Sequence, residues 1–234
     1  MRLNLFISKS GLTSRRKADF LIKEGKVEVN GVSVKEPFFE VRDKDSVRVE
    51  GRVLALKSYV YIVFNKPCGV TATVSDRFAT KTVIDFMPRE FKGVYPVGRL
   101  DKESSGLLIL TNDGDFCYKL THPKFSAEKE YLVKVEGVLG VSQCKRAKIG
   151  IRDEKDFLRV KEIRILRRRG SESLIRVVIT EGKKRHLRRL FKKLGFRVLA
   201  LKRVRIAGLM LGALKEGQFT LMDKAKIYKL CIEK

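Results

Sequence analysis

Apolar and polar residues alternate along this chain with two different periods, and the change from one period to the other divides it into parts. Two helical stripes come first, each followed by a glycine: Leu3, Phe6 and Ile7 before Gly11, and Ala18, Leu21 and Ile22 before Gly25. Thr13 or Ser14 is positioned to cap the second helix. The N-terminal stretch therefore predicts two short helices.

Strand periodicity follows these helices. Alternation picks out two short strands and a third farther on: Val27 with Val29, Val32 with Val34, and Val47 with Val49. Between the first two, Asn30-Gly31 supplies the positive φ that a tight hairpin turn needs. We expect a boundary near Lys57, which gives a small α+β domain over 1–57 and a larger domain over 58–234.

The larger part alternates strands with helices and shows no internal repeat. The predicted strands are Tyr59 to Asn65, Val94 to Leu100, Leu107 to Thr111, Glu130 to Val135, Leu158 to Leu166, Leu174 to Thr180 and Val198 to Ile206. The predicted helices are Thr82 to Met87, Asp115 to Leu120, Val141 to Ile149 and Lys183 to Leu194. The run from Arg167 to Glu172 is expected to form a hairpin turn or exposed loop. This order predicts an α+β domain around a mixed sheet.

Charge points to a polyanionic partner. The 234 residues contain 52 Lys and Arg against 27 Asp and Glu, a formal net charge of +25, which is typical of a protein that binds nucleic acid. The apolar segment at the N-terminus is too short for the core of a signal peptide, and no membrane span is expected. Four separated cysteines and two histidines offer no zinc-ligand spacing, so we expect reduced thiols, a cytoplasmic location and no metal.

One acid stands out against this charge. Asp101 lies beside Arg99 and just ahead of the apolar run Leu107 to Leu110. A carboxylate repels phosphate, so RNA or DNA affinity does not account for it. We interpret Asp101 as the candidate catalytic residue.

A basic helix is predicted downstream. Its apolar stripe consists of Leu187, Leu190, Phe191 and Leu194, and its cations project elsewhere. Arg188 falls at the margin of the stripe, where its guanidinium could reach into a cleft. Burial alone would neutralise a carboxylate, whereas a close guanidinium keeps it ionised and orients its oxygens. Arg188 is therefore the expected partner of Asp101, while Lys192 and Lys193 are best explained as solvated charges.

Other polar groups are candidates for RNA contact. A basic helix start favours phosphate through its amides and side chains, and further cations lie ahead of and along the later helix. The candidate RNA-binding residues are Ser14, Arg15, Arg16, Lys17, Lys26 and Asn30 near the N-terminus, and Lys183, Lys184, Arg185 and Arg189 farther on. Tyr131, on a predicted strand, is either a packed sheet aromatic or a stacking platform for an extruded base.

The order of motifs resembles two known families. Residues 1 to about 55 resemble the S4 RNA-binding domain, named for a small-subunit ribosomal protein. The rest is similar to the RsuA/RluB/RluF-type family of ribosomal RNA pseudouridine synthases, through Asn65-Lys66-Pro67-x-Gly69, Gly98-Arg99-Leu100-Asp101-x-x-Ser104-x-Gly106-Leu107-Leu108, Lys129-x-Tyr131-x-Val133 and Glu181-Gly182-Lys183-x-x-x-x-Arg188-Arg189.

This second resemblance implies roles for individual residues. Asp101 would be the catalytic aspartate, Tyr131 the active-site tyrosine and Arg188 the basic partner of the aspartate. Arg99, Leu100 and Leu201 would line the substrate pocket. His186 stands where the family commonly has glutamine, and we expect it to pack or to bond backbone rather than to act as a base.

The family also implies a fold and a reaction. The larger domain would hold a mixed, largely antiparallel sheet flanked by helices, and a monomer would isomerise uridine in ribosomal RNA without a cofactor. Asp101 could attack the sugar, add to the ring or remove a sugar proton, and the sequence does not choose among these. A non-catalytic ribosome-assembly protein is the main alternative. An RNA methyltransferase lacks support because no glycine-rich nucleotide loop is present, and a metal-dependent nuclease would need clustered carboxylates.

Overall fold

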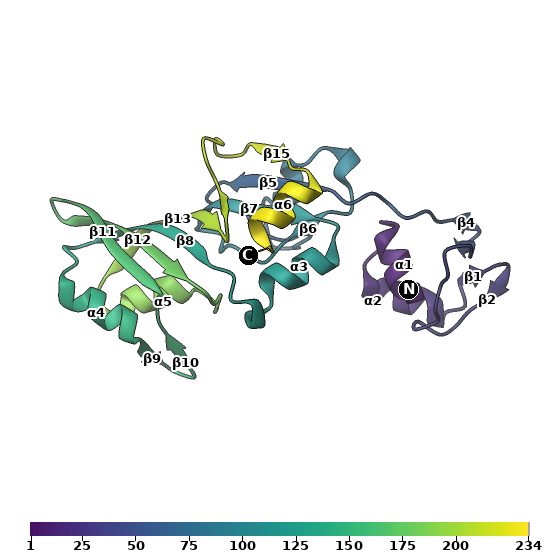
Figure 1. Cartoon of the computed structure of the whole chain (residues 1–234), viewed down its shortest axis with the longest axis horizontal. Helices are drawn as coiled ribbons and strands as arrows, with labels where there is room; N and C mark the ends of the chain where they lie inside the picture. Colours follow the sequence, from purple (N-terminus) through teal and green to yellow (C-terminus); the bar gives the residue numbers. More distant parts are fainter. Residues whose placement is uncertain (234) are drawn as a thin grey trace. The chain divides into compact units, whose positions relative to one another are not determined.

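A computed structural model describes residues 1–233, and the chain divides into two compact units (Figure 1). The first unit comprises Met1–Val60 together with Pro88–Val94. The second comprises Tyr61–Met87 and the chain from Tyr95 onward. The pattern of apolar residues did not predict that the short segment 88–94 belongs with the first unit.

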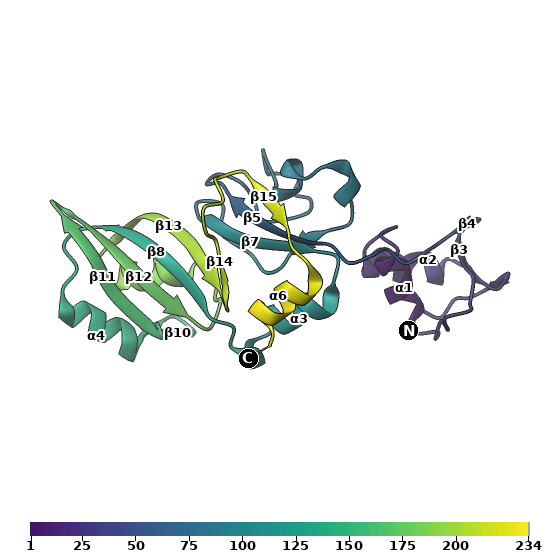
Figure 2. The ribbon, with the colours of Figure 1, turned by 45° about the horizontal axis from the view of Figure 1, so that its top comes forward.

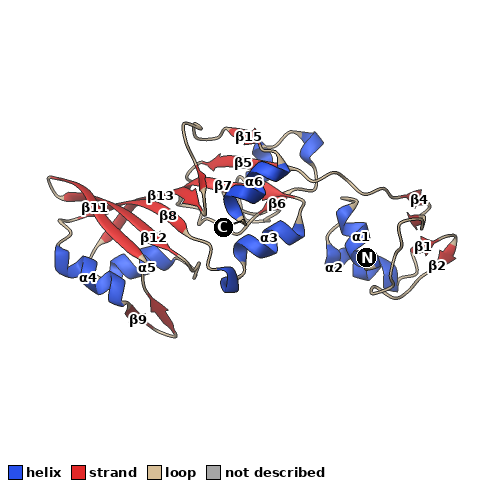
Figure 3. Ribbon diagram, in the orientation of Figure 1, coloured by secondary structure: helices blue, strands red, loops and turns tan. Residues whose placement is uncertain are grey.

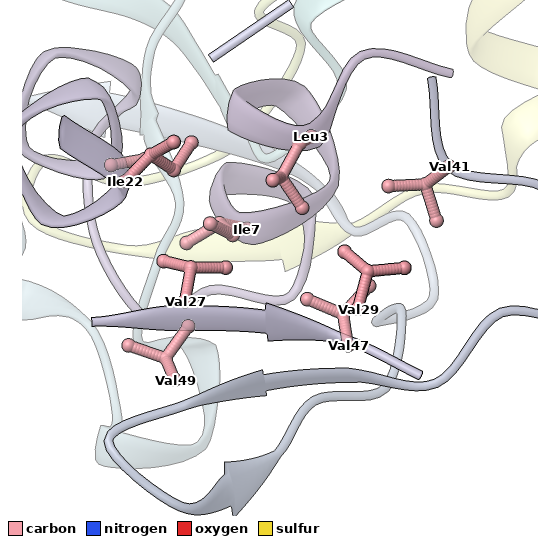
Figure 4. Packing of buried hydrophobic residues seen from close by; sticks show 9 residues of the cluster. Leu3, Ile7, Ile22, Val27, Val29, Val41, Val47 and Val49 are labelled. Atoms are coloured by element: carbon pink, nitrogen blue, oxygen red, sulfur yellow. The ribbon is translucent and has the colours of Figure 1, made fainter. Parts of the chain in front are cut away.

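The first unit is two helices on a small antiparallel sheet of order β2-β1-β3-β4. Its elements are α1 (Leu3–Lys9), α2 (Arg15–Lys23), β1 (Val27–Val29), β2 (Val32–Ser33), β3 (Val47–Val49), β4 (Arg52–Val53) and the 3₁₀ helix η2 (Arg89–Phe91). Ser14 caps α2 by accepting from the Lys17 amide, and Asn30 and Gly31 have φ of 54° and 82°, as a tight turn requires. Figure 4 shows how Leu3, Ile7 and Ile22 from the helices meet valines of the strands in one core.

The second unit is built on a nine-stranded sheet. The sheet order is β11-β12-β8-β13-β7-β5-β15, with β14 and β6 pairing at the side, and β9 and β10 form a separate hairpin. The strands are β5 (Tyr61–Lys66), β6 (Tyr95–Pro96), β7 (Ser105–Thr111), β8 (Lys129–Glu136), β9 (Ile151–Asp153), β10 (Asp156–Leu158), β11 (Glu162–Arg169), β12 (Glu172–Ile179), β13 (Arg197–Ile206), β14 (Leu209–Met210) and β15 (Phe219–Leu221). The helices are η1 (Val83–Phe86), α3 (Gly114–Thr121), η3 (Pro123–Phe125), α4 (Val141–Ile149), α5 (His186–Lys193) and α6 (Lys224–Cys231).

This architecture confirms the predicted fold class of an α+β protein with a mixed, largely antiparallel sheet. All strand pairs of the nine-stranded sheet are antiparallel except the pair β7 and β13. Figure 3 shows helices flanking the strands of this unit. Helices α4 and α5 lie along the end formed by β11, β12, β8 and β13, and α3 and α6 lie side by side near β7 in both ribbon views (Figures 1 and 2).

Some predicted elements differ from the structure for identifiable reasons. The strand expected over Val94 to Leu100 shrinks to β6, because the chain turns at Gly98, which has φ of 75°. The strand expected over Leu158 to Leu166 is two strands, β10 and β11. Helix α5 begins at His186 rather than Lys183, because Arg185 adopts left-handed backbone at φ 52°. Helix α6 was not predicted.

Helix α6 is tied to the sheet by a buried acid. Asp113 is 1% exposed and accepts hydrogen bonds from the hydroxyls of Tyr61 at 2.6 Å and Tyr228 at 2.7 Å. Its other oxygen accepts from the amides of Asp115 and Phe116 and so caps α3. These hydrogen bonds lower the pKa of Asp113 although its burial alone would raise it. One carboxylate thus links β5, α3 and α6.

The parallel pair β7 and β13 joins two parts of the sheet through a very close backbone approach. Its register places Lys202 beside Ser105 and Arg203 beside Gly106. Gly106 has φ of 105°, and a Cβ atom on it would lie 2.2 Å from the Arg203 carbonyl oxygen. Only glycine combines this backbone conformation with this approach.

Gly106→Ala should therefore destabilise the protein by more than about 2 kcal/mol, because both strain and a backbone clash oppose the methyl group. Chemical denaturation of the full chain measures the change. Gly170→Ala is the matched control, since Gly170 also has positive φ but nothing lies within 4 Å of the place that the added methyl group would take. Equal losses of stability in the two variants would contradict this account of the strand junction.

Candidate active site

A cavity of about 780 Å³ lies in the second unit. Eight of the residues predicted as site or RNA-binding residues line it: Arg99, Leu100, Asp101, Tyr131, Lys183, Lys184, Arg185 and Leu201. They come from the turn before β7, from β8, from the turn before α5 and from β13. The structure thus brings together side chains that are up to about a hundred positions apart in the sequence.

Asp101 is half-buried and begins a tight turn. The Ser104 amide donates to the Asp101 carbonyl at 3.0 Å, and the Gly69 amide donates to the Lys102 carbonyl at 2.8 Å. The turn then runs directly into β7. The Asp101 carboxylate is therefore held by its backbone, because the described residues give it no ion pair or hydrogen bond.

Lys66 is a buried cation that joins the loop after β5 to this turn. Its side chain is 0% exposed, and its ammonium donates to the carbonyls of Pro67 at 2.9 Å, Val70 at 2.8 Å and Lys102 at 3.5 Å. Burial lowers the pKa of Lys66 to about 8, and the charge of Asp101 acts in the opposite direction. Lys66 and Asp101 are thus close enough to interact electrostatically, a pairing that the sequence did not suggest.

Helix α5 holds the same turn from another side. The Arg188 guanidinium donates to the Glu103 carbonyl at 2.8 Å and to the Val198 carbonyl at 3.5 Å. The Arg185 guanidinium pairs with the Glu103 carboxylate at 2.9 Å. The direct Arg188–Asp101 ion pair that we expected is absent from the described structure. Arg188 instead bonds the carbonyl of Glu103, two residues beyond Asp101, because this carbonyl of the turn points toward α5.

A row across three strands forms one wall of the cavity. Tyr131 on β8 lies opposite Arg203 on β13, and Arg203 lies beside Gly106 on β7. Tyr131 is 7% exposed, and Leu201 lies two residues before Arg203 on the same strand. The Asp101 turn enters β7, so the register places Leu201 on the next strand, β13, and Tyr131 on the strand after that, β8.

Arg203 is a site residue that sequence reasoning missed. It is 2% exposed and its Nε donates to the Leu107 carbonyl at 2.7 Å, while its buried Nη2 has no partner. An unpartnered guanidinium nitrogen in a polar cavity can receive an anionic or carbonyl group from a ligand. No signal in the sequence singles out Arg203, because Arg197, Lys202 and Arg205 lie on the same strand.

His186 is buried and bonds backbone, as predicted. It is 4% exposed, and its Nε2 lies 3.0 Å from the Arg159 carbonyl oxygen. Burial lowers the pKa of its imidazole, so the ring is neutral at pH 7. The protonated nitrogen that bonds a carbonyl must be Nε2, because a carbonyl only accepts.

Other predicted RNA contacts lie away from the cavity. Arg189 is held by the carboxylates of Asp153 and Asp156, both at 2.6 Å, and so ties the β9–β10 hairpin to α5. Asn30 bonds Asp45 and the Ser46 amide at 2.9 Å each and thereby stabilises its own turn. The remaining candidates are exposed on the first unit: Ser14, Arg15, Arg16, Lys17 and Lys26, the last within 3.6 Å of Glu50.

The part of the chain that is described contains neither a candidate metal centre nor a membrane-spanning helix. Within residues 1–233, no group of three or more His, Cys, Asp or Glu side chains is placed to share a metal ion. No helix in the same range has the length and apolarity to cross a membrane.

The site and its surroundings suit a class of protein: an RNA-modifying enzyme that places a carboxylate on a fixed turn in a cation-rich cavity on a mixed sheet. Comparisons with known proteins agree. The family model for RNA pseudouridylate synthase matches residues 60–193, and the S4 domain model matches residues 1–47. A crystal structure of a pseudouridylate synthase superposes with a TM-score of 0.70 at 28% identity, over 98% of this chain and 99% of that one.

Two relatives are similar over nearly their whole length. Ribosomal large subunit pseudouridine synthase B of Bacillus subtilis (strain 168) is 39% identical over 218 residues, which cover 92% of this chain and 89% of the relative. An uncharacterized RNA pseudouridine synthase of Aquifex aeolicus (strain VF5) is 37% identical over 232 residues, covering 98% and 93%. The chain belongs to the RNA pseudouridine synthase family, and it is an isomerase that acts on uridine in RNA.

The buried ammonium of Lys66 predicts a pH dependence of stability. The pKa of a lysine in an unfolded chain is about 10.4, whereas the pKa of Lys66 in the folded protein is about 8. Below about pH 8 the folded protein therefore carries a buried charge that its interior disfavours. The free energy of unfolding should therefore rise between pH 8 and pH 10, where the unfolded chain binds more protons. Lys66→Met should reduce this rise.

Denaturation at a series of pH values between 7 and 10 measures the effect. The exposed Lys155→Met provides the control, because it removes one lysine without changing the buried site. A pH profile of Lys66→Met that is superimposable on the wild-type profile would show that Lys66 is not the titrating group.

Proposed function

We propose that this enzyme converts a specific uridine of ribosomal RNA to pseudouridine, in the large subunit, with Asp101 as the catalytic carboxylate. The choice of RNA is supported by the similarity to the large-subunit enzyme of Bacillus subtilis. The observation that carries the assignment of Asp101 is its place in a cavity otherwise rich in cations, on a turn fixed from three sides.

The reaction explains why a fixed carboxylate is needed. The bond from the sugar to the ring nitrogen breaks, the base turns, and the sugar carbon bonds to a ring carbon, which loses its proton while the nitrogen gains one. Each route open to Asp101 needs the ionised form: attack on the sugar, addition to the ring or removal of a sugar proton. The buried ammonium of Lys66 lies close enough to Asp101 to interact with its charge. Backbone anchoring fixes the direction of the carboxylate, which supports reaction from one bound geometry.

The cavity also has to hold a base that has left its stack. Extrusion of a nucleotide costs a few kcal/mol and must be offset by protein contacts. Tyr131 can stack on the uracil ring, Leu201 can exclude water from it, and the free nitrogen of Arg203 can bond a uracil carbonyl. We assign substrate-pocket roles to these three residues, and to Arg99 and Leu100 at the entrance of the Asp101 turn.

The surrounding cations serve RNA affinity. Lys183, Lys184 and Arg185 line the cavity, and the exposed cations at the start of α2 lie on the S4 domain. Both groups offer contacts to phosphate, with the counterion release that makes such binding sensitive to salt. We further propose that the enzyme works as a monomer in the cytoplasm, since one chain supplies every residue of the cavity and all four cysteines are free thiols.

Asp101→Asn should bind the RNA with nearly unchanged affinity but form no pseudouridine, because the amide keeps the size of the side chain and loses its charge. Incubation with unmodified ribosomal RNA, followed by tritium release or mass analysis of the product, measures the loss. Asp115→Asn, which changes an acid outside the cavity, is the control. Turnover of Asp101→Asn near the wild-type level would remove this carboxylate from the mechanism.

Arg188→Ala and Arg189→Ala form a matched pair of neighbouring substitutions. Loss of the Arg188 bond to Glu103 frees the turn that carries Asp101, so kcat should fall roughly 100-fold or more. Arg189→Ala removes the ion pairs with Asp153 and Asp156, so it should lower the free energy of unfolding by about 1 kcal/mol. Its kcat should stay near the wild-type value. Steady-state kinetics and denaturation separate the two. The reverse order of activities would contradict the role given to Arg188.

A further inference from the structure

The loop between β5 and η1 exposes an aromatic side chain almost completely. Phe78 is 95% exposed, more than any other large hydrophobic residue in the range 1–233. Full exposure forgoes roughly 1.5 to 3 kcal/mol that burial of such a ring would contribute. Packing within this chain therefore gives no reason for a phenylalanine here.

The loop tip is a defined turn that directs Phe78 outward. The Phe78 amide donates to the Asp76 carboxylate at 2.9 Å, and the Ala79 amide donates to the Asp76 carbonyl at 3.4 Å. The first bond closes an Asx turn and the second a four-residue turn, so together they fix the backbone of Arg77 and Phe78. The exposed position of the ring thus follows from an ordered, hydrogen-bonded turn.

The base of the same loop is part of the active site. Thr71 bonds Lys81 and Val83 through the backbone, each at 3.0 Å, which closes the neck of the loop. Thr71, Ala72, Thr73 and Asp76 line the cavity that contains Asp101. The exposed ring therefore stands on a loop whose inner side faces the place where the target base must enter.

The residues around the ring suit a nucleic-acid surface. Arg77 precedes Phe78 and is exposed, and Lys81 at the neck lies with its ammonium 4.5 Å from the Phe86 ring centre. Cations on both sides of an apolar ring can contact phosphates while the ring enters between bases, as apolar wedges do in nucleic-acid complexes that unstack a base step.

We infer that Phe78 is a wedge that enters the RNA stack at the position left by the extruded uridine. The inference rests on the proposed function of the Asp101 cavity. The occupant is the RNA itself, at the base step that loses a stacking partner when the uridine leaves. The ring replaces that partner, so it stabilises the flipped state without touching the reacting atoms. Phe78 is in this sense a positioning residue.

The test compares variants of the full chain on two RNAs. A stem-loop oligonucleotide carries the uridine mapped as the product site in ribosomal RNA, with that uridine paired and stacked. In a second oligonucleotide, an abasic site stands opposite the same uridine, which is then already partly unstacked. Phe78→Ala is compared with Phe78→Trp, and with Val74→Ala as a control in the same loop, where Val74 is apolar and 53% exposed but has no ring.

Phe78→Ala should lower kcat/KM on the stacked substrate about 10-fold or more, the size expected for one aromatic stacking contact. The defect should shrink to within about 3-fold on the abasic substrate, because less unstacking remains to be offset. Phe78→Trp should restore most of the activity, and Val74→Ala should stay near wild type. Thermal unfolding should be the same for all, since the ring is exposed.

Two outcomes would overturn the inference: equal activity of Phe78→Ala and wild type on the stacked RNA, or an equal defect on both RNAs. Failure of the proposed function is seen separately. In that case the wild-type enzyme forms no pseudouridine in either oligonucleotide, or Asp101→Asn remains active, whatever residue stands at position 78.

Discussion

The backbone contact between Gly106 and Arg203 is the constraint on which the active site depends. It lies in the parallel pair through which β7 and β13 join the two parts of the sheet, and that pair has only two registered positions. On one side β7 continues from the turn of Asp101, and on the other side β13 carries Arg203 and Leu201 beside Tyr131. A change in that contact would move the carboxylate relative to the tyrosine. The site therefore needs glycine at position 106, because only glycine lets the two backbones approach this closely.

The second property of the site is that its carboxylate is positioned by backbone anchors rather than by an ion pair. Lys66 at the end of β5 and Gly69 in the loop after it bind the turn from one side, and Arg188 binds it from α5. A tight ion pair would hold the oxygens of Asp101 and compete with the substrate for them. Anchoring the turn through its carbonyls leaves those oxygens free. The contacts that fix the turn are thus separate from the carboxylate oxygens.

The sequence predicted the parts that depend on local pattern and on motif order. It predicted the helices and the hairpin of the S4 domain, most strands of the larger sheet, and the fold class. The joint placement of Asp101, Tyr131 and Leu201 at one cavity followed from the family resemblance, not from periodicity. The parallel junction, the buried charge of Lys66 and the cavity position of Arg203 were not predictable, because each depends on contacts between distant residues. The expected Arg188–Asp101 pair was wrong in detail for the same reason: helix periodicity gives the face of Arg188 but not which atom of the turn it meets.

A crystal structure of Asp101→Asn bound to its RNA tests the account most directly, because the variant should capture the substrate without converting it. We predict that the target uridine is extruded into the cavity, with its ring on Tyr131 and its sugar within roughly 3.5 Å of the residue-101 side chain. A uridine that remains stacked in the RNA, or one bound with residue 101 turned away from both sugar and ring, would contradict the claim that this carboxylate carries out the isomerisation.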